Sequence, residues 1–366
     1  ALGLLAPMSA TANEITISDF TPAEELAITN SRVDGLEARL NNIEAGSFSE
    51  TTTASFSADM MIGAVTGGAQ NDENEAIGDG TMAGYSFQID LNTSFTGEDS
   101  FDVSLDAGNS GATGIVEFGG NSGGDQLSVD GVSYTFPLGD KTTVIVGDNT
   151  DGSALFTTSC AYGGPSDTLD DCGNVNAGIT NGGAMVGASY DFGTGFTAAV
   201  GYAAGESDMA TGLLTKETLD AYGVNAAYTG DNFGISVTYG LVETSSADED
   251  TFTAFNGYYA PEGFPSISVG YEIGEDGSVT DKTADELTSF FVGLQFDELG
   301  PGSAGIAVGT KTPTVEKTDE QYMYEAYYSY PINDGMTITP LVFIKETSTA
   351  GVDDETGVMV KTSFSF

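Results

Sequence analysis

Residues 233–241 read Phe-Gly-Ile-Ser-Val-Thr-Tyr-Gly-Leu, with a bulky apolar side chain at each odd position and a small or polar one at each even position. Side chains of a β-strand point alternately to opposite faces, so this pattern predicts a strand with one apolar face. The alternation recurs at 266–273, 290–296 and 322–330. Segments of about ten residues with this period are typical of membrane β-strands. The chain is therefore predicted to be all-β.

The composition favours a transmembrane antiparallel β-barrel over a soluble β-sandwich. The 366 residues include 50 Gly, 21 Phe and 16 Tyr, which suits turns and pleated surfaces better than helices. A sandwich also alternates, but its strands are shorter, about five to six residues, and its inward face needs large side chains. Here the second face carries Gly, Ser, Thr, Asn, Asp and Glu, which suits a water-filled interior.

Connection lengths set the topology of the predicted barrel. Short connections such as 191–195 and 331–335 alternate with long ones such as 205–218 and 311–321. This is the arrangement of short periplasmic turns and long outer loops. We expect sixteen strands, at 51–64, 82–95, 100–108, 126–137, 140–148, 183–193, 195–205, 219–229, 232–243, 251–260, 264–274, 287–297, 302–311, 321–331, 335–346 and 356–366. The even count places both ends of the chain on the periplasmic side of the barrel.

Two connections allow more than one structure. Residues 113–119 could form a strand, but one extra strand would make the count odd, so we place them in the second outer loop. Residues 149–182 form the longest connection and follow the fifth strand. They either fold into the lumen and narrow it or form a braced surface loop. Cys160 and Cys172, the two cysteines, are expected to pair there, because an oxidising compartment lets a nearby pair form a disulfide.

The N-terminal part before the barrel is expected to contain a helix. Thr21 can cap the helix, Pro22 occupies the first helical position and Glu24 occupies the capping-box position. Gly46 is expected to end the helix. A seven-residue repeat flanked by Arg and Glu predicts a short parallel coiled coil. Its residues are Leu26, Val33, Leu40, Leu36 and Ile43, with Arg32, Arg39, Glu37 and Glu44 as the charged set. An amphipathic helix packed on the barrel is the alternative.

Three parts of the chain are expected. Residues 1–12, which end Ala-Thr-Ala, are similar to the tail of a secretory signal peptide. Residues 13–46 form a periplasmic linker and the helix, and residues 47–366 form the outer-membrane barrel. From Asn13 onward no run of about 18 or more apolar residues exists, so no transmembrane helix is expected.

The charge is strongly acidic. Nine Lys and Arg against 55 Asp and Glu give a formal net charge of −46, which excludes nucleic acid as a partner because phosphate binding needs a basic face. If the bulky residues face lipid, the opposite positions line the pore. The predicted pore-lining residues are Asp90, Asp102, Asp106, Glu272, Asp297, Glu325, Lys345 and Lys361. Their acidic balance predicts a weak preference for cations that salt screens.

The final strand, Val358 to Phe366, ends on an aromatic residue, as terminal strands of bacterial outer-membrane proteins do. Together with Asn30–Gly46 and Gly124–Asp148, it makes residues 13–366 resemble the porins of cyanobacteria, those of marine unicellular forms most closely. This carbohydrate-selective and iron-uptake porin group implies a homotrimer among membrane lipid and lipopolysaccharide. Members usually carry a surface-layer-homology domain before the coiled coil. Residues 13–21 are too few for one, so the resemblance leaves wall attachment open.

These patterns predict a passive diffusion channel for small hydrophilic solutes and inorganic ions, and not an enzyme. The sequence has no His and no recognisable nucleophile–base pair. No cofactor or metal is expected, since the acidic segment 246–250 lacks the spacing of a calcium loop. Two other classes stay open. A structural anchor or receptor barrel would conduct little, and a secreted acidic adhesin would extract without detergent.

Overall fold

The computed structural model describes residues 52–67, 80–110, 116–118, 121, 124–180, 182–205, 212–215, 219–244, 248–279, 285–348 and 351–366. The chain divides into two compact units, residues 1–53 and 54–366. The expected signal-peptide remnant (1–12) and coiled-coil helix (within 13–46) lie outside the described residues and stay predictions.

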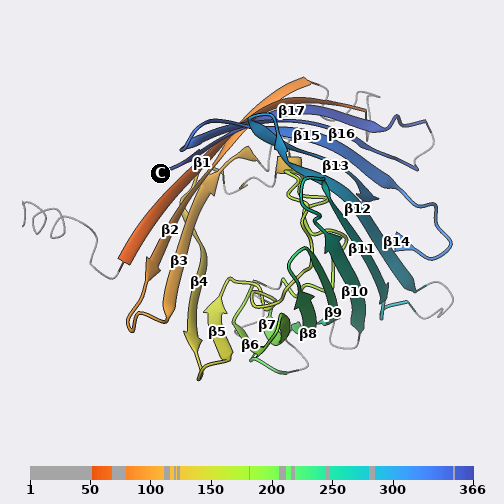
Figure 1. The fold of residues 1–366 in the computed structure, drawn as a ribbon. Helices are drawn as coiled ribbons and strands as arrows, with labels where there is room; N and C mark the ends of the chain where they lie inside the picture. The colour runs from red at the N-terminus through yellow and green to blue at the C-terminus, as the bar shows by residue number, and fades with distance from the viewer. Residues whose placement is uncertain are drawn as a thin grey trace, which may run out of the picture. The chain divides into compact units, whose positions relative to one another are not determined.

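The second unit is one antiparallel sheet closed into a barrel (Figure 1). Its long strands are β1 (Thr52–Thr66), β2 (Gly80–Thr93), β3 (Ser100–Gly108), β4 (Ser128–Pro137), β5 (Thr142–Asp148), β6 (Met185–Gly193), β7 (Phe196–Ala204), β8 (Asp220–Thr229), β9 (Phe233–Glu243), β10 (Glu249–Tyr259), β11 (Ser266–Glu275), β12 (Glu286–Leu299), β13 (Gly302–Thr310), β15 (Tyr322–Asn333), β16 (Met336–Lys345) and β17 (Glu355–Ser365). A further strand of two residues, β14 (Thr314–Val315), pairs with β12. β17 pairs with β1, with Thr362 opposite Met60, so the last strand closes the sheet on the first. The long strands match the predicted ranges within a few residues, and the sixteen-strand barrel is confirmed.

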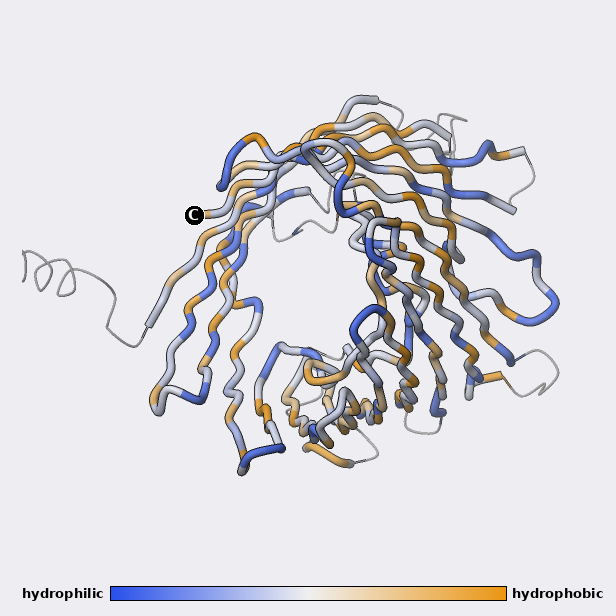
Figure 2. Tube along the Cα trace, in the orientation of Figure 1, coloured by the Kyte–Doolittle hydropathy of each residue, from blue (hydrophilic) through white to orange (hydrophobic). Residues whose placement is uncertain are grey.

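The predicted alternation corresponds to the two faces of the barrel wall. On β9, Ile235 is 58% exposed on the outside, whereas Thr238 is fully buried on the inside. Val200, Val269 and Val342 extend the exposed apolar face to other strands. Figure 2 shows the resulting alternation of apolar and polar residues along the strands. The outer surface is therefore an apolar belt, as a membrane-facing wall requires.

Short and long connections lie at opposite ends of the barrel, which we call the short-turn end and the long-loop end. The turn between β6 and β7 shows why glycine is needed: Gly195 has a φ of 88°, and a Cβ there would overlap the carbonyl oxygen of Thr229. In the long connection between β3 and β4, Val116–Phe118 forms one turn of 3-10 helix. The described part of 113–119 thus lies in a connection.

Outward aromatic rings gather at both ends of the wall. At the short-turn end, Phe196 and Tyr228 have ring centroids 4.7 Å apart, and Phe56 stacks on Phe366 at 5.7 Å. At the long-loop end, Tyr202 and Tyr222 lie 5.4 Å apart. Such aromatic rows mark the two interfaces of membrane barrels. Among the described residues, no helix is long and apolar enough to cross a membrane.

Candidate functional site

The described residues of 149–184 (149–180 and 182–184), between β5 and β6, fold inside the barrel, and we call this segment the lumen loop. Backbone N–H groups of every second residue donate to inward side chains of the wall. The bonds run from Thr157 to Asn225 Oδ1 (3.0 Å), Ser159 to Ser236 Oγ (2.9 Å), Ala161 to Ser268 Oγ (2.8 Å) and Gly163 to Gln295 Oε1 (3.4 Å). The acceptors lie on β8, β9, β11 and β12, so this half of the loop runs along the inner face of the wall from strand to strand (Figure 1). Of the two interpretations of this loop, the surface loop is excluded.

The returning half of the lumen loop is held by a carboxylate of the wall. Glu272 on β11 is 2% exposed and accepts three hydrogen bonds of 2.8 Å, from the backbone N and side-chain Nδ2 of Asn176 and from the backbone N of Ala177. A disulfide joins Cys160 and Cys172, with their Cα atoms 6.4 Å apart. It links the outgoing half of the loop to the returning half.

Inward glycines of the wall give the lumen loop room. A Cβ at Gly270 would overlap the carbonyl oxygen of Cys172, and a Cβ at Gly201 would overlap that of Gly152. A Cβ at Gly240 would lie 2.8 Å from the carbonyl oxygen of Ala177. The sequence pattern predicts that these small residues face water. The structure shows that part of this set is small because the loop packs on it.

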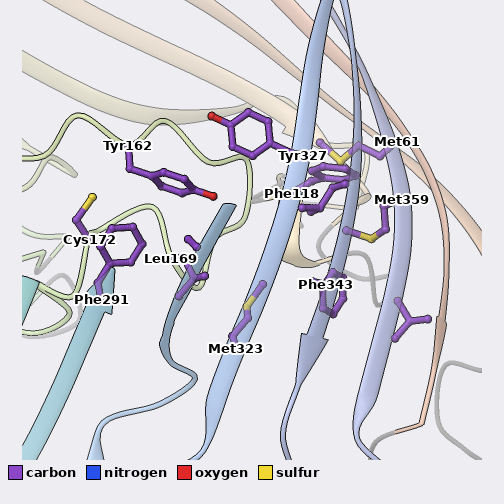
Figure 3. Packing of buried hydrophobic residues seen from close by; sticks show 13 residues of the cluster. Met61, Phe118, Tyr162, Leu169, Cys172, Phe291, Met323, Tyr327, Phe343 and Met359 are labelled. Atoms are coloured by element: carbon purple, nitrogen blue, oxygen red, sulfur yellow. The ribbon is translucent and has the colours of Figure 1, made fainter. Parts of the chain in front are cut away.

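An apolar cluster fills the interior beside β12, β15, β16 and β17 (Figure 3). Tyr162 of the lumen loop packs on Phe291 and Tyr327, with ring centroids 5.3 and 5.9 Å apart, and its hydroxyl donates to Glu325 Oε1 at 2.6 Å. The other members include Met61, Phe118, Leu169, Met323, Phe343 and Met359. The expectation of a polar interior is therefore wrong on this side, because loop residues cover apolar wall residues and exclude water.

A buried ion pair fixes the connection between β3 and β4 to the same side. Lys345 on β16 is 9% exposed and donates to Glu117, which is 2% exposed. Thr168 of the lumen loop also donates to Glu117, at 3.2 Å. Lys361 lies with its Nζ 5.4 Å from the centre of the Phe118 ring. The two inner connections and the wall thus share one charged contact.

The predicted pore-lining residues fall into three groups, besides Lys361 against the Phe118 ring. Glu272, Glu325 and Lys345 point inward but lie under loops, so they hold loops and do not face open space. Asp297 lies exposed near the short-turn end. Asp90, Asp102 and Asp106, on the inner face of β2 and β3, hydrogen-bond to small polar neighbours on β2, β3 and β4.

Two further carboxylates lie on this side, Asp130 on β4 and Asp151 at the start of the lumen loop. Asp102, Asp130 and Asp151 line a recess of about 350 Å³ together with Ser104 and Asn149. Partial desolvation, and after it the charge of Asp130, raise the pKa of Asp151. The strand pattern did not reveal Asp130, because a β-bulge opposite Ser104 and Leu105 shifts the register there. We call Asp90, Asp102, Asp106, Asp130 and Asp151 the acidic face.

The lumen loop brings its own ionisable groups. Asp170 and Asp171 line a polar cavity of about 390 Å³ within the loop, beside Asn174 and Thr158. Desolvation is the main cause that raises the pKa of Asp171 to about 7 and that of Asp170 to about 6. The negative charge inside the barrel therefore varies near neutral pH. Within the described part of the chain, no cluster of three or more His, Cys, Asp or Glu side chains could hold a metal ion.

Known proteins share this architecture. No family model matches the chain. An uncharacterized protein of Nostoc sp. is 25% identical, over 98% of this chain and 74% of that protein. Among solved structures, Pseudomonas putida OprB superposes with a TM-score of 0.62 at 11% identity, covering 86% of this chain and 94% of OprB. A mutant of Rh. blastica porin superposes at 0.55 with 13% identity, covering 86% of this chain and all of the porin. The fold is that of a bacterial porin barrel.

Proposed function

We propose that the chain is an outer-membrane porin, a passive channel for small hydrophilic solutes and inorganic ions. The observation that carries the proposal is the lumen loop, which packs on the inner wall of a closed barrel from β8 to β12 and leaves the carboxylates of the acidic face lining the interior beside β2, β3 and β4. The apolar belt and its two aromatic rows support a place in a membrane. The short turns then lie on the periplasmic side.

Cation preference is part of the same proposal. The acidic face contributes five carboxylates, and the two lysines predicted to line the pore, Lys345 and Lys361, lie against Glu117 and Phe118 on the other side. A wall of one charge sign raises the local concentration of counter-ions, and salt weakens the effect. The preference should accordingly be modest.

The assembly and its surroundings are proposed from the sequence. A homotrimer held partly by the helix within 13–46, contacts with lipopolysaccharide, and the cyanobacterial porin group follow from the resemblance and from the heptad pattern. The signal-peptide assignment of 1–12 belongs to the same set. Deleting residues 1–46 is expected to weaken the oligomer, which cross-linking of the intact and shortened chains checks.

A structural or receptor barrel with little conductance is the second candidate. The apolar cluster around Phe291 and Tyr162 favours it, because this cluster fills part of the interior that a wide channel would leave to water. Purified protein in planar lipid bilayers distinguishes the two functions. Stepwise conductance supports the porin, and silent bilayers with correctly folded protein support the structural barrel.

A further inference from the structure

The connection between β7 and β8 folds back to the outside of the barrel at the long-loop end. Its two ends meet where the backbone N of Gly205 donates to the carbonyl oxygen of Leu219 at 2.9 Å. Near its middle, residues 212–215 form a turn. The backbone of Leu214 lies within hydrogen-bonding reach of the hydroxyl of Tyr202, whose ring belongs to the outward aromatic row. The turn therefore lies against the outer side of the wall.

The outward positions beside this turn are covered. Val200 and Val224 face each other across β7 and β8 and are exposed on the outside. Asp220 belongs to the same outward set on β8, yet it is buried. It accepts a hydrogen bond of 2.6 Å from the hydroxyl of Tyr202. Tyr202 and the turn beside it thus keep this carboxylate off the outer surface at the level of the aromatic row.

In place of that charge, the turn presents two leucines. Leu213 and Leu214 are 45% and 67% exposed. Leu214 has a φ of 59°, a left-handed conformation that glycine or asparagine adopts at lower cost. No two adjacent large apolar residues occur in the later outer connections, which are 243–251, 274–287, 311–321 and 346–356. An exposed leucine pair on a strained turn therefore sets this connection apart from those.

The position of the turn indicates what the two leucines contact. Aromatic rows of membrane barrels lie at the level of the headgroups, and the apolar belt begins next to them. Apolar side chains at this level enter the headgroup and acyl boundary by about 5–10 Å, as those of interfacial helices do. Transfer of exposed leucine side chains from water to acyl chains is favourable. The partner that fits the turn is therefore the part of the acyl layer nearest the headgroups.

We propose that Leu213 and Leu214 insert into the acyl layer of the outer leaflet and anchor the connection between β7 and β8 to the membrane. In the proposed outer membrane these acyl chains belong to lipopolysaccharide. The inference rests on the proposed function, because only a membrane-embedded barrel has acyl chains at this level. The anchor holds the connection on the outer side of the wall, away from the channel mouth.

Tryptophan fluorescence tests the anchor, because the chain has no Trp and one introduced Trp reports a single position. The full chain with Leu214→Trp is reconstituted in vesicles of dioleoylphosphatidylcholine, or of phosphatidylcholine brominated near the headgroup end of its acyl chains. We expect the brominated lipid to quench this Trp. Leu213→Asp in the same chain should lower the ratio of inserted to free turn about tenfold, the partition of one leucine side chain, and should reduce the quenching. Leu213→Met should preserve it.

Two further positions calibrate the quenching. Val200→Trp places the reporter in the outward belt and should be quenched in the same vesicles. Thr318→Trp places it in the outer connection between β14 and β15, where Thr318 is exposed beside Asp319 and Glu320, and should be quenched little. Gel mobility of unboiled samples verifies that each variant is folded.

The outcomes separate the anchor from the proposed porin. If Leu214→Trp is quenched no more than Thr318→Trp while Val200→Trp is quenched, the barrel lies in the membrane and the anchor is wrong. If Val200→Trp also escapes quenching, the membrane location fails, and the porin and the anchor fail with it. Equal quenching with and without Leu213→Asp overturns the insertion of the leucine pair. Short-wavelength emission of Leu214→Trp without quenching by bromine places the turn against a second copy of the chain and overturns the lipid anchor.

Discussion

The hydroxyl of Tyr162 donates to Oε1 of Glu325 at 2.6 Å, joining the lumen loop to a strand 163 positions further along the chain. Both residues are buried. The bond therefore connects the loop position directly to the barrel wall. It is one of several contacts that hold the loop against the wall, and it lies within an apolar cluster.

Removing this bond should loosen the lumen loop. Tyr162→Phe leaves a buried acceptor unpaired, which costs about 1–3 kcal/mol of local stability. We expect faster hydrogen exchange across 156–164 and more open-channel noise. Tyr328→Phe is the control, because it removes a hydroxyl bond to the Leu299 carbonyl at the short-turn end. Equal exchange in the Tyr162→Phe variant and the wild type would contradict this prediction.

Removing the disulfide should expose the lumen loop to proteases. The bond between Cys160 and Cys172 closes a segment with a sequence separation of 12 residues, for which a stabilisation of about 3 kcal/mol is typical. The Cys160→Ala/Cys172→Ala double variant should be nicked within 149–184 faster than the oxidised wild type, with the strands left intact. A nicking rate independent of the disulfide would show that the wall contacts alone hold the loop.

The Lys345–Glu117 pair should behave as a buried ion pair. Lys345→Met is expected to lower the free energy of unfolding by about 3–5 kcal/mol, because Glu117 is then buried without its cation. Adding Glu117→Gln should recover much of the loss. The matched control is Lys317→Met, which removes the exposed pair with Glu316 and should change stability by less than about 1 kcal/mol. Gel mobility of unboiled detergent samples across a temperature series measures each change.

The strands were predictable from the sequence because their signal is local. Alternation as at Ile235 and Thr238 needs only the period of a pleated chain, and it gave the strand ranges within a few residues. The contacts of the lumen loop were not predictable, because its partners lie far away in the chain. Ala161, for example, bonds Ser268, 107 residues further on.

The same limit explains the pore-lining predictions. The two-residue period of the strands predicts that the side chains of Glu272, Glu325 and Lys345 point inward. Whether a loop covers these side chains depends on tertiary packing. Asp130 was missed because a bulge interrupts the period, and Asp151 because it belongs to a loop. Phe291 and Phe343 are bulky residues on the inner face, where the alternation predicts small or polar ones, and only the structure shows the apolar cluster that buries them.

The lumen loop should be held more weakly as pH rises. Desolvation raises the pKa of Asp171 from 3.8 to about 7, so the folded loop binds a proton more tightly than the unfolded loop does. The stability from this proton is fully present below pH 3.8 and is lost as pH rises through about 7. Protease nicking of 149–184 should therefore be faster at high pH. Asp171→Asn should flatten this dependence, while Asp231→Asn in a short turn should leave it intact.

The reversal potential in planar bilayers tests the proposed channel most directly. In a tenfold KCl gradient we expect stepwise conductance with a potential of the sign set by K⁺, which shrinks as total salt rises because the acidic face is screened. Replacing Asp102 and Asp130 with Asn should reduce the potential further, and Glu262→Gln, in an exposed short turn, should leave it unchanged. Silent bilayers, or a potential of the sign set by Cl⁻ in the wild type, would contradict the account.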